Sequence, residues 1–173
     1  MDFEMITDKH SYGGGYISLR NFDLQNVPEK VDIDGYELLK QNEFHISIMA
    51  LKNLAPMLDV ENPEQACEQL KRDFLEFAKT HNLAGFRLTG EYRMVQRDER
   101  VTIVAMVELR NINKLFDYLR SKHGIDFPTQ PTHITMYTLH PNVGIGILSQ
   151  DELANNSSLV SIPALANMEI EYA

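Results

Sequence analysis

Two short segments of the chain alternate apolar and polar side chains, which is the pattern of half-buried strands. In residues 44–51 the aliphatic side chains fall on one face, and His45 and Ser47 fall on the other. In residues 132–139 the same alternation recurs after two prolines. Because successive side chains of a strand point to opposite faces, each segment is expected to bury its aliphatic face and to present its polar face to a cleft.

The second segment adds an aromatic residue to this polar face. His133, Thr135 and Tyr137 alternate with Ile134 and Met136. On this spacing we expect Tyr137 to lie beside the histidine and the threonine. Its ring would either stack on a substrate base or form part of the cleft wall without touching substrate.

The rest of the chain predicts helices and strands in a mixed order. Apolar residues recur with helical spacing in two longer segments, and polar turns separate further alternating segments. The expected elements are strands at 16–20, 86–95, 101–109 and 168–172, and helices at 63–81, 113–122 and, briefly, 149–154. We predict an α+β fold that occupies residues 1–173 as one unit, because no linker-like segment separates independent domains.

Composition narrows the expected partners and location. The formal net charge of −9 over 173 residues repels long polyanions, so a nucleic-acid substrate is expected to be short or terminal. No apolar run approaches the roughly 20 residues that a membrane span requires. The N-terminal segment lacks the apolar middle of a secretory signal. We therefore expect no membrane contact and a cytoplasmic location.

The two alternating segments carry the same motif. His45-Ile-Ser47-Ile and His133-Ile-Thr135-Met both read as histidine, aliphatic, hydroxyl, aliphatic. A single His-x-Ser in a strand usually marks an ordinary structural histidine. Two copies in the same strand context favour a functional role, because neighbouring strands would bring two imidazoles and two hydroxyls into one cleft.

Paired imidazoles suit in-line transfer of a phosphoryl group. One removes a proton from the nucleophile while the other protonates the departing oxygen on the opposite side. With an ordinary pKa of about 6.5, one histidine can be neutral and the other charged near neutral pH if their surroundings differ. Ser47 and Thr135 would donate hydrogen bonds to the nonbridging phosphoryl oxygens. His45 and His133 are thus the candidate catalytic residues.

Other residues offer weaker candidates. A metal site is not expected, because no Asp, Glu or Cys stands out as a third ligand beside the two histidines. Arg87 and Arg93 alternate on an expected strand and would supply positive charge if that strand faced the cleft. Tyr12 and Tyr16 flank a glycine-rich turn; we interpret them first as ordinary aromatic residues of an edge strand, with a cover over the site as the alternative.

The two motifs resemble those of the 2H (LigT-like) phosphoesterases. The resemblance rests on the four residues at positions 45, 47, 133 and 135 and on a compatible order of elements. It implies a bilobal fold in which two pseudo-symmetric antiparallel sheets, flanked by helices, surround a central groove. It also implies catalysis without metal or cofactor, with the two histidines as catalytic residues and the two hydroxyls binding phosphate.

Three functions remain open on the sequence. The first is hydrolysis of a nucleotide or RNA 2',3'-cyclic phosphate. The second keeps this chemistry but acts on a cyclic oligonucleotide or a 2'-5' oligoadenylate signal. The third is a noncatalytic protein that binds a nucleotide or an RNA end in the same cleft. Each predicts a small nucleotide or a short RNA end as partner, and none fixes the oligomeric state.

Overall fold

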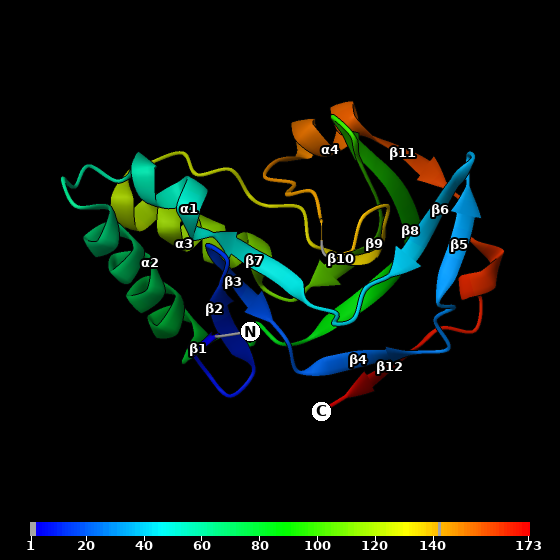
Figure 1. The fold of residues 1–173 in the computed structure, drawn as a ribbon. Helices are drawn as coiled ribbons and strands as arrows, with labels where there is room; N and C mark the ends of the chain where they lie inside the picture. Colours follow the sequence, from blue (N-terminus) through cyan, green and yellow to red (C-terminus); the bar gives the residue numbers. More distant parts are fainter. Residues whose placement is uncertain (1–2, 142) are drawn as a thin grey trace.

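The computed structural model describes residues 3–141 and 143–173, and it combines helices with antiparallel strands (Figure 1). The fold class is therefore α+β, as expected. The strands are β1 (Glu4–Met5), β2 (His10–Gly13), β3 (Tyr16–Leu19), β4 (Phe22–Gln25), β5 (Lys30–Ile33), β6 (Tyr36–Lys40), β7 (Ile46–Ala50), β8 (Phe86–Arg97), β9 (Arg100–Leu109), β10 (His133–Thr138), β11 (Ser157–Val160) and β12 (Glu169–Tyr172). The helices are α1 (Leu51–Leu54), α2 (Pro63–Ala78), α3 (Ile112–His123) and α4 (Gln150–Asn156), with 3-10 turns at Ala55–Met57 and Pro163–Leu165.

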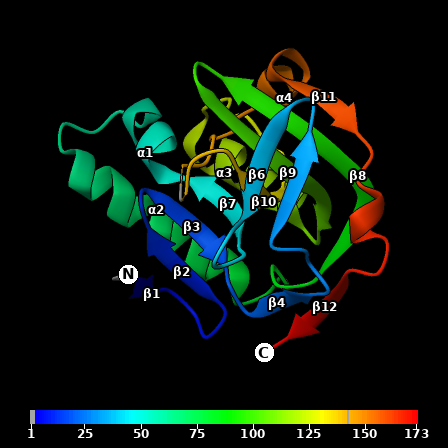
Figure 2. The same ribbon diagram turned by 45° about the vertical axis from the view of Figure 1, so that its right-hand side comes forward.

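One hydrogen-bonded path connects most of the strands in the order β1-β2-β3-β7-β10-β9-β8-β11. A hairpin of β5 and β6 joins this path where β6 pairs with β10, and β4 pairs separately with β12. Figure 1 shows α1, α2 and α3 grouped beside β2, β3 and β7, whereas α4 lies beside β8 and β11. Turning the molecule shows the β5–β6 hairpin in front of β8 and β9 (Figure 2).

The two strands that carry the repeated motif meet at the middle of this path. β7 and β10 are antiparallel and pair at Ile46 and Ile134. Further along the same edge of β10, Tyr137 pairs with Lys40 of β6. Residues 41–45 therefore form a long interruption between β6 and β7, since five residues separate Lys40 from Ile46 where only two separate their partners on β10. His45 lies at the end of this interruption, so β7 begins two residues later than predicted.

The aliphatic faces of both motif strands belong to the main core. Ile46, Ile48, Ile134 and Met136 are fully buried. They share one hydrophobic cluster with residues of the two long helices, including Leu70, Phe74, Leu115 and Phe116. The amphipathic pattern of α2 and α3 produces this arrangement, because each helix has one apolar stripe to bury. At its start, α2 is capped by the Asn62 side chain, which accepts from the Glu64 N–H.

Two turns differ from the sequence prediction. The β8–β9 hairpin closes with Asp98 and Glu99 alone, where a five-residue turn was expected, because Asp98 adopts a positive φ of 56°. The β5–β6 hairpin was not predicted. Its turn, Asp34-Gly35, has positive φ at both residues and belongs to the turn type that favours tight hairpins. Within the described residues, no helix is long and apolar enough to cross a membrane.

Candidate active site

A cleft of about 650 Å³ lies where the two motif strands meet. The four polar residues of the repeat, His45, Ser47, His133 and Thr135, all line it. The structure thus brings together the residues that the sequence pairs. Neither hydroxyl has a hydrogen-bond partner in the described part of the protein, so both remain free to donate to a ligand in the cleft.

His133 is fixed by the entry of the chain into β10. The Thr132 hydroxyl donates to the Val107 carbonyl at 2.8 Å, and this bond ties the residue before the histidine to β9. The Nδ1 of His133 lies 3.2 Å from the carbonyl oxygen of Pro131. Since a carbonyl only accepts, Nδ1 carries the proton in this contact and Nε2 is left to exchange a proton with a ligand. Burial lowers the pKa of His133, while the Pro131 carbonyl acts in the opposite direction.

His45 sits in a different electrostatic environment. Its pKa is lowered to about 4 by burial first, then by the positive charge of Arg20 and by His133. Both imidazoles line the same cleft. Both histidines have a lowered pKa, but their immediate neighbours act differently. Arg20 opposes a proton on His45, whereas the Pro131 carbonyl favours one on His133.

Both motif strands are bulged at the same place in the repeat. On β7, the register with β3 shifts after Ser47, because Ser47 and Met49 pair with the adjacent residues Ser18 and Ile17. On β10, the register with β9 shifts after Thr135 in the same way. An extra residue in a strand breaks the regular alternation of its side chains. The cleft-facing row therefore stops at the hydroxyl residue in both copies.

The bulge corrects the placement of Tyr137. Alternation predicts it on the cleft face, but it is fully buried in the main core and does not line the cleft. Its hydroxyl donates to the Pro28 carbonyl at 2.9 Å, and burial raises its pKa to about 12. Stacking of Tyr137 on a substrate base is thus inconsistent with the structure. Met49, at the equivalent place in the first copy, is also fully buried.

The cleft concentrates positive charge in an otherwise acidic molecule. Among the described residues, Arg20, Lys52 and Arg100 line it against one carboxylate, that of Glu43, and Arg100 also lies 3.6 Å from the Asp98 carboxylate. Glu43 lies 3.6 Å from one terminal nitrogen of Arg20, and the Arg20 Nε is buried without a hydrogen-bond partner. This local excess of cations suits an anionic ligand. A net charge of −9 does not reveal it, because net charge carries no information about one cleft.

The arginines at the cleft are not the ones suggested by the sequence. Arg87 pairs with Glu108, and Arg93 pairs with Glu91 at 2.5 Å and donates to the Ser157 hydroxyl at 3.1 Å. Neither lines the cleft. Arg20 directly follows β3 and Arg100 begins β9, and both were missed because neither lies in a His-x-hydroxyl motif. No sequence signal distinguishes them from other surface arginines.

A loop after β10 forms the opposite wall. Ile145 and Ile147 line the cleft and are themselves buried in a small second core with Val95, Val104 and Leu153. This anchoring fixes a wall that has no regular secondary structure. The loop therefore depends on packing against β8, β9 and α4 for its position.

Tyr16, the first residue of β3, approaches this loop at Gly146. A Cβ placed on Gly146 would come within 2.8 Å of the Tyr16 hydroxyl oxygen, so the ring approaches the glycine closely. The Lys52 ammonium lies 4.7 Å from the centre of the same ring. Tyr16 thus lines the cleft, as the alternative interpretation allowed, whereas Tyr12 does not.

Over the residues that the structure describes, no group of three or more His, Cys, Asp and Glu side chains is placed to hold a metal ion. Comparison with known proteins adds nothing to the site. No protein-family model, no curated protein and no solved structure matches the chain. The functional interpretation accordingly rests on the geometry of the cleft.

Proposed function

We propose that this protein is a metal-independent phosphodiesterase that hydrolyses a nucleotide or RNA 2',3'-cyclic phosphate. One observation carries the proposal: two copies of a His-x-hydroxyl motif line the same cleft, each ended by a bulge after the hydroxyl. The excess of cations around these four residues supports an anionic substrate. The two-histidine arrangement supports acid and base chemistry on it.

The proposed reaction is an in-line attack of water on the cyclic phosphate. A new P–O bond forms to the water oxygen, and the bond from phosphorus to the 2' or 3' oxygen of the ribose breaks. The base takes a proton from the water, and the acid gives one to the departing ribose oxygen. The product is a ribose with one free hydroxyl and one phosphomonoester.

The surroundings of the two histidines favour one assignment of these tasks. His45 has Arg20 beside it and a pKa of about 4, so it stays unprotonated and acts as the base. A bound phosphodiester carries negative charge and raises the pKa of both imidazoles. His133 then holds a proton with the help of the Pro131 carbonyl and acts as the acid. Two groups with separated proton affinities are what concerted acid–base catalysis needs.

The other cleft residues are proposed to bind the phosphoryl oxygens. Ser47 and Thr135 donate hydrogen bonds to the nonbridging oxygens, and Arg20, Lys52 and Arg100 balance the charge that redistributes in the transition state. We also propose that the strands on the β7 side and the strands on the β10 side of this continuous path are the two lobes of a 2H phosphoesterase fold. The matched bulges of the two strands support this pseudo-symmetry.

A substrate panel tests this function. The protein is incubated with 2',3'-cyclic nucleotides of all four bases in the presence of a chelator, and products are separated by chromatography. We expect conversion to a 2' or 3' phosphomonoester that the His45→Ala/His133→Ala double variant does not perform. This variant, purified identically, controls for contaminating phosphodiesterases. Unchanged substrate across the panel, with binding retained, would instead favour a nucleotide-binding protein without activity.

A further inference from the structure

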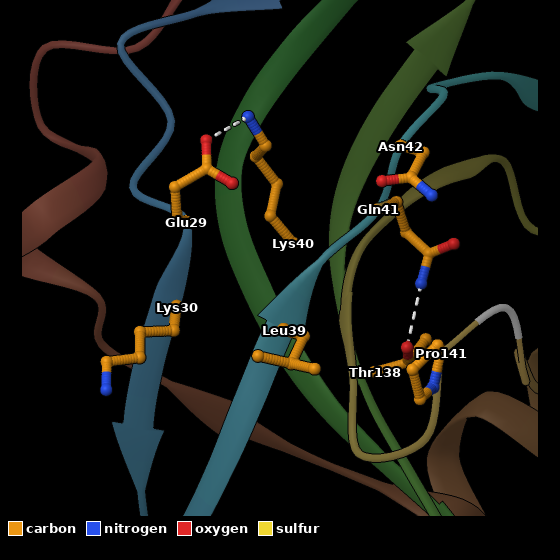
Figure 3. Close-up of a pocket in the computed structure, with 8 residues that line it drawn as sticks. All are labelled: Glu29, Lys30, Leu39, Lys40, Gln41, Asn42, Thr138 and Pro141. Atoms are coloured by element: carbon orange, nitrogen blue, oxygen red, sulfur yellow. Dashed lines mark hydrogen bonds and ion pairs between the residues drawn. The ribbon is translucent and has the colours of Figure 1, made fainter.

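A second cavity of about 310 Å³ opens beside the catalytic cleft. Gln41 and Asn42 line both cavities, so they form the divide between them. Figure 3 shows the second cavity between the β5–β6 hairpin on one side and the end of β10 with Pro141 on the other. Its position lets a ligand in the catalytic cleft extend across the divide into the second cavity.

The divide is held in place before any ligand binds. The Gln41 backbone N–H donates to the Met136 carbonyl at 2.9 Å, and its side-chain Nε2 donates to the Thr138 hydroxyl at 2.9 Å (Figure 3). Thr138 is itself buried. Both bonds tie the interrupted segment 41–45 to β10. The amide oxygen of Gln41 and the exposed amide of Asn42 remain available to a ligand.

The lining of the second cavity matches one nucleoside. Leu39, which is 38% exposed, and Pro141 supply apolar surface against which a base can pack. The amides of Gln41 and Asn42 supply the donors and acceptors that read base edges. Lys40 reaches across to Glu29 at 2.7 Å and forms the outer rim (Figure 3). A volume of about 310 Å³ is near the lower limit for a ligand pocket, so the cavity holds one such group.

We propose that this second cavity, lined by Leu39, Gln41, Asn42 and Pro141, binds the second nucleoside of a substrate that has at least two. The inference rests on the proposed function, because it places the scissile phosphate between His45 and His133. It narrows the substrate from a mononucleotide to an oligonucleotide end or a cyclic oligonucleotide. A mononucleoside 2',3'-cyclic phosphate would occupy the catalytic cleft and leave the second cavity without a contact.

Two matched substrates test this inference. Adenosine 2',3'-cyclic phosphate and the dinucleotide ApA ending in a 2',3'-cyclic phosphate present the same reacting group and differ by one nucleoside. We expect the parent protein to show a kcat/KM roughly tenfold or more higher for the dinucleotide, the value of one well-packed base. Equal values for both substrates would overturn the inference and leave the proposed function intact.

A variant that fills the cavity sharpens the test. Leu39→Trp places a large ring in the second cavity at a partly exposed strand position, where aromatic residues are tolerated. We expect it to remove the preference for the dinucleotide while changing turnover of the mononucleotide less than about twofold. Leu159→Trp, on the exposed strand β11, is the matched control and should keep the preference. Equal loss on both substrates in Leu39→Trp would contradict a second nucleoside site.

Failure of catalysis is distinguished by binding. If the parent turns over neither substrate, the proposed function fails, and calorimetric titration with the same two compounds decides the inference by itself. The parent should then bind the dinucleotide more tightly than the mononucleotide, and Leu39→Trp should abolish the difference. Equal affinities in the parent would refute the second site independently of any activity.

Discussion

At the scale of single residues, the environments of the two histidines matter more than their identity. A histidine in a strand is common, and only its neighbours give it a chemical task. Arg20 reaches the cleft from the end of β3, and the Pro131 carbonyl lies two residues before His133. Arg20 opposes a proton on His45 and the Pro131 carbonyl favours one on His133, so two side chains that the sequence shows as equivalent have different neighbours. The sequence predicted the pair but could not assign the roles, since Arg20 lies outside both motifs.

Replacing Arg20 should raise the pKa of His45. Arg20→Gln removes a positive charge that lowers it, so we expect an increase of roughly one pH unit above the value of about 4. The pKa should still stay below its ordinary value of about 6.5, because burial is the larger cause. NMR titration of the His45 imidazole measures it. Lys52→Gln is the matched control, since Lys52 lines the same cleft without being a cause of the shift, and a similar rise there would contradict the role of Arg20.

Tyr137 should contribute to stability and not to activity. Tyr137→Phe removes a buried hydrogen bond to the Pro28 carbonyl, which should lower the free energy of unfolding by about 1 kcal/mol. Urea denaturation measures this loss, and kcat/KM should stay within about twofold of the parent. Tyr172→Phe, at an exposed position, should change neither quantity. If Tyr137→Phe lowered kcat/KM without changing stability, this would contradict the buried position and indicate that the Tyr137 side chain acts in the cleft.

At the scale of elements, alternation predicted the strands and failed where they are bulged or interrupted. The faces of His45 and Ser47, and of His133 and Thr135, follow from a period of two. One extra residue after each hydroxyl turns Met49 and Tyr137 into the core. The local sequence pattern carries no signal for such a bulge. The interruption at 41–45 was equally invisible, because it is defined by pairing with β10. Asp34-Gly35 is a readable turn signal in the sequence, because an Asp-Gly pair favours the turn type that closes tight hairpins.

The contact between Gly146 and Tyr16 should control the shape of the cleft. Gly146→Ala places a methyl group against the Tyr16 hydroxyl, so we expect kcat/KM to fall roughly tenfold or more as the ring or the loop moves. Gly144→Ala, in the same loop, meets no atom of the described residues within 4 Å and should behave as the parent. Steady-state kinetics on a 2',3'-cyclic nucleotide measures both.

A second substitution separates this contact from a general disturbance of the loop. Tyr16→Phe removes the hydroxyl that the added methyl group would meet. We expect the Gly146→Ala/Tyr16→Phe double variant to recover kcat/KM to the level of Tyr16→Phe alone. If the losses in kcat/KM of the two single variants simply add in the double variant, the close approach of Gly146 to the Tyr16 hydroxyl does not control the shape of the cleft.

At the scale of the whole molecule, charge is divided between an acidic surface and a basic cleft. The net charge of −9 disfavours long polyanions, while three cations at the cleft attract a small anion. Composition gives the acidic net charge, whereas the cluster of cations at the cleft is visible only in the fold. Under the proposed function, the two adjoining cavities offer room for one or two nucleosides beside the scissile phosphate.

A long RNA duplex should be a poor competitor for the cleft. We expect 2'-AMP or 3'-AMP to inhibit hydrolysis of a 2',3'-cyclic nucleotide. Duplex RNA, added at the same concentration of phosphate groups, should leave the rate within about twofold of the uninhibited rate. Repulsion by the acidic surface is strongest at low salt, so the difference should be largest there. Inhibition by duplex that exceeds inhibition by the mononucleotide would contradict this division of charge.

The rate of hydrolysis in single-histidine variants tests the central claim most directly. His45→Ala and His133→Ala are each compared with the parent on a 2',3'-cyclic nucleotide in chelator, with His81→Gln as a histidine control outside the cleft. If both imidazoles exchange protons in the transition state, each alanine variant should lose about 100-fold to 10,000-fold in kcat, and the control should match the parent. Retention of a rate within tenfold of the parent by either alanine variant would contradict paired histidine catalysis.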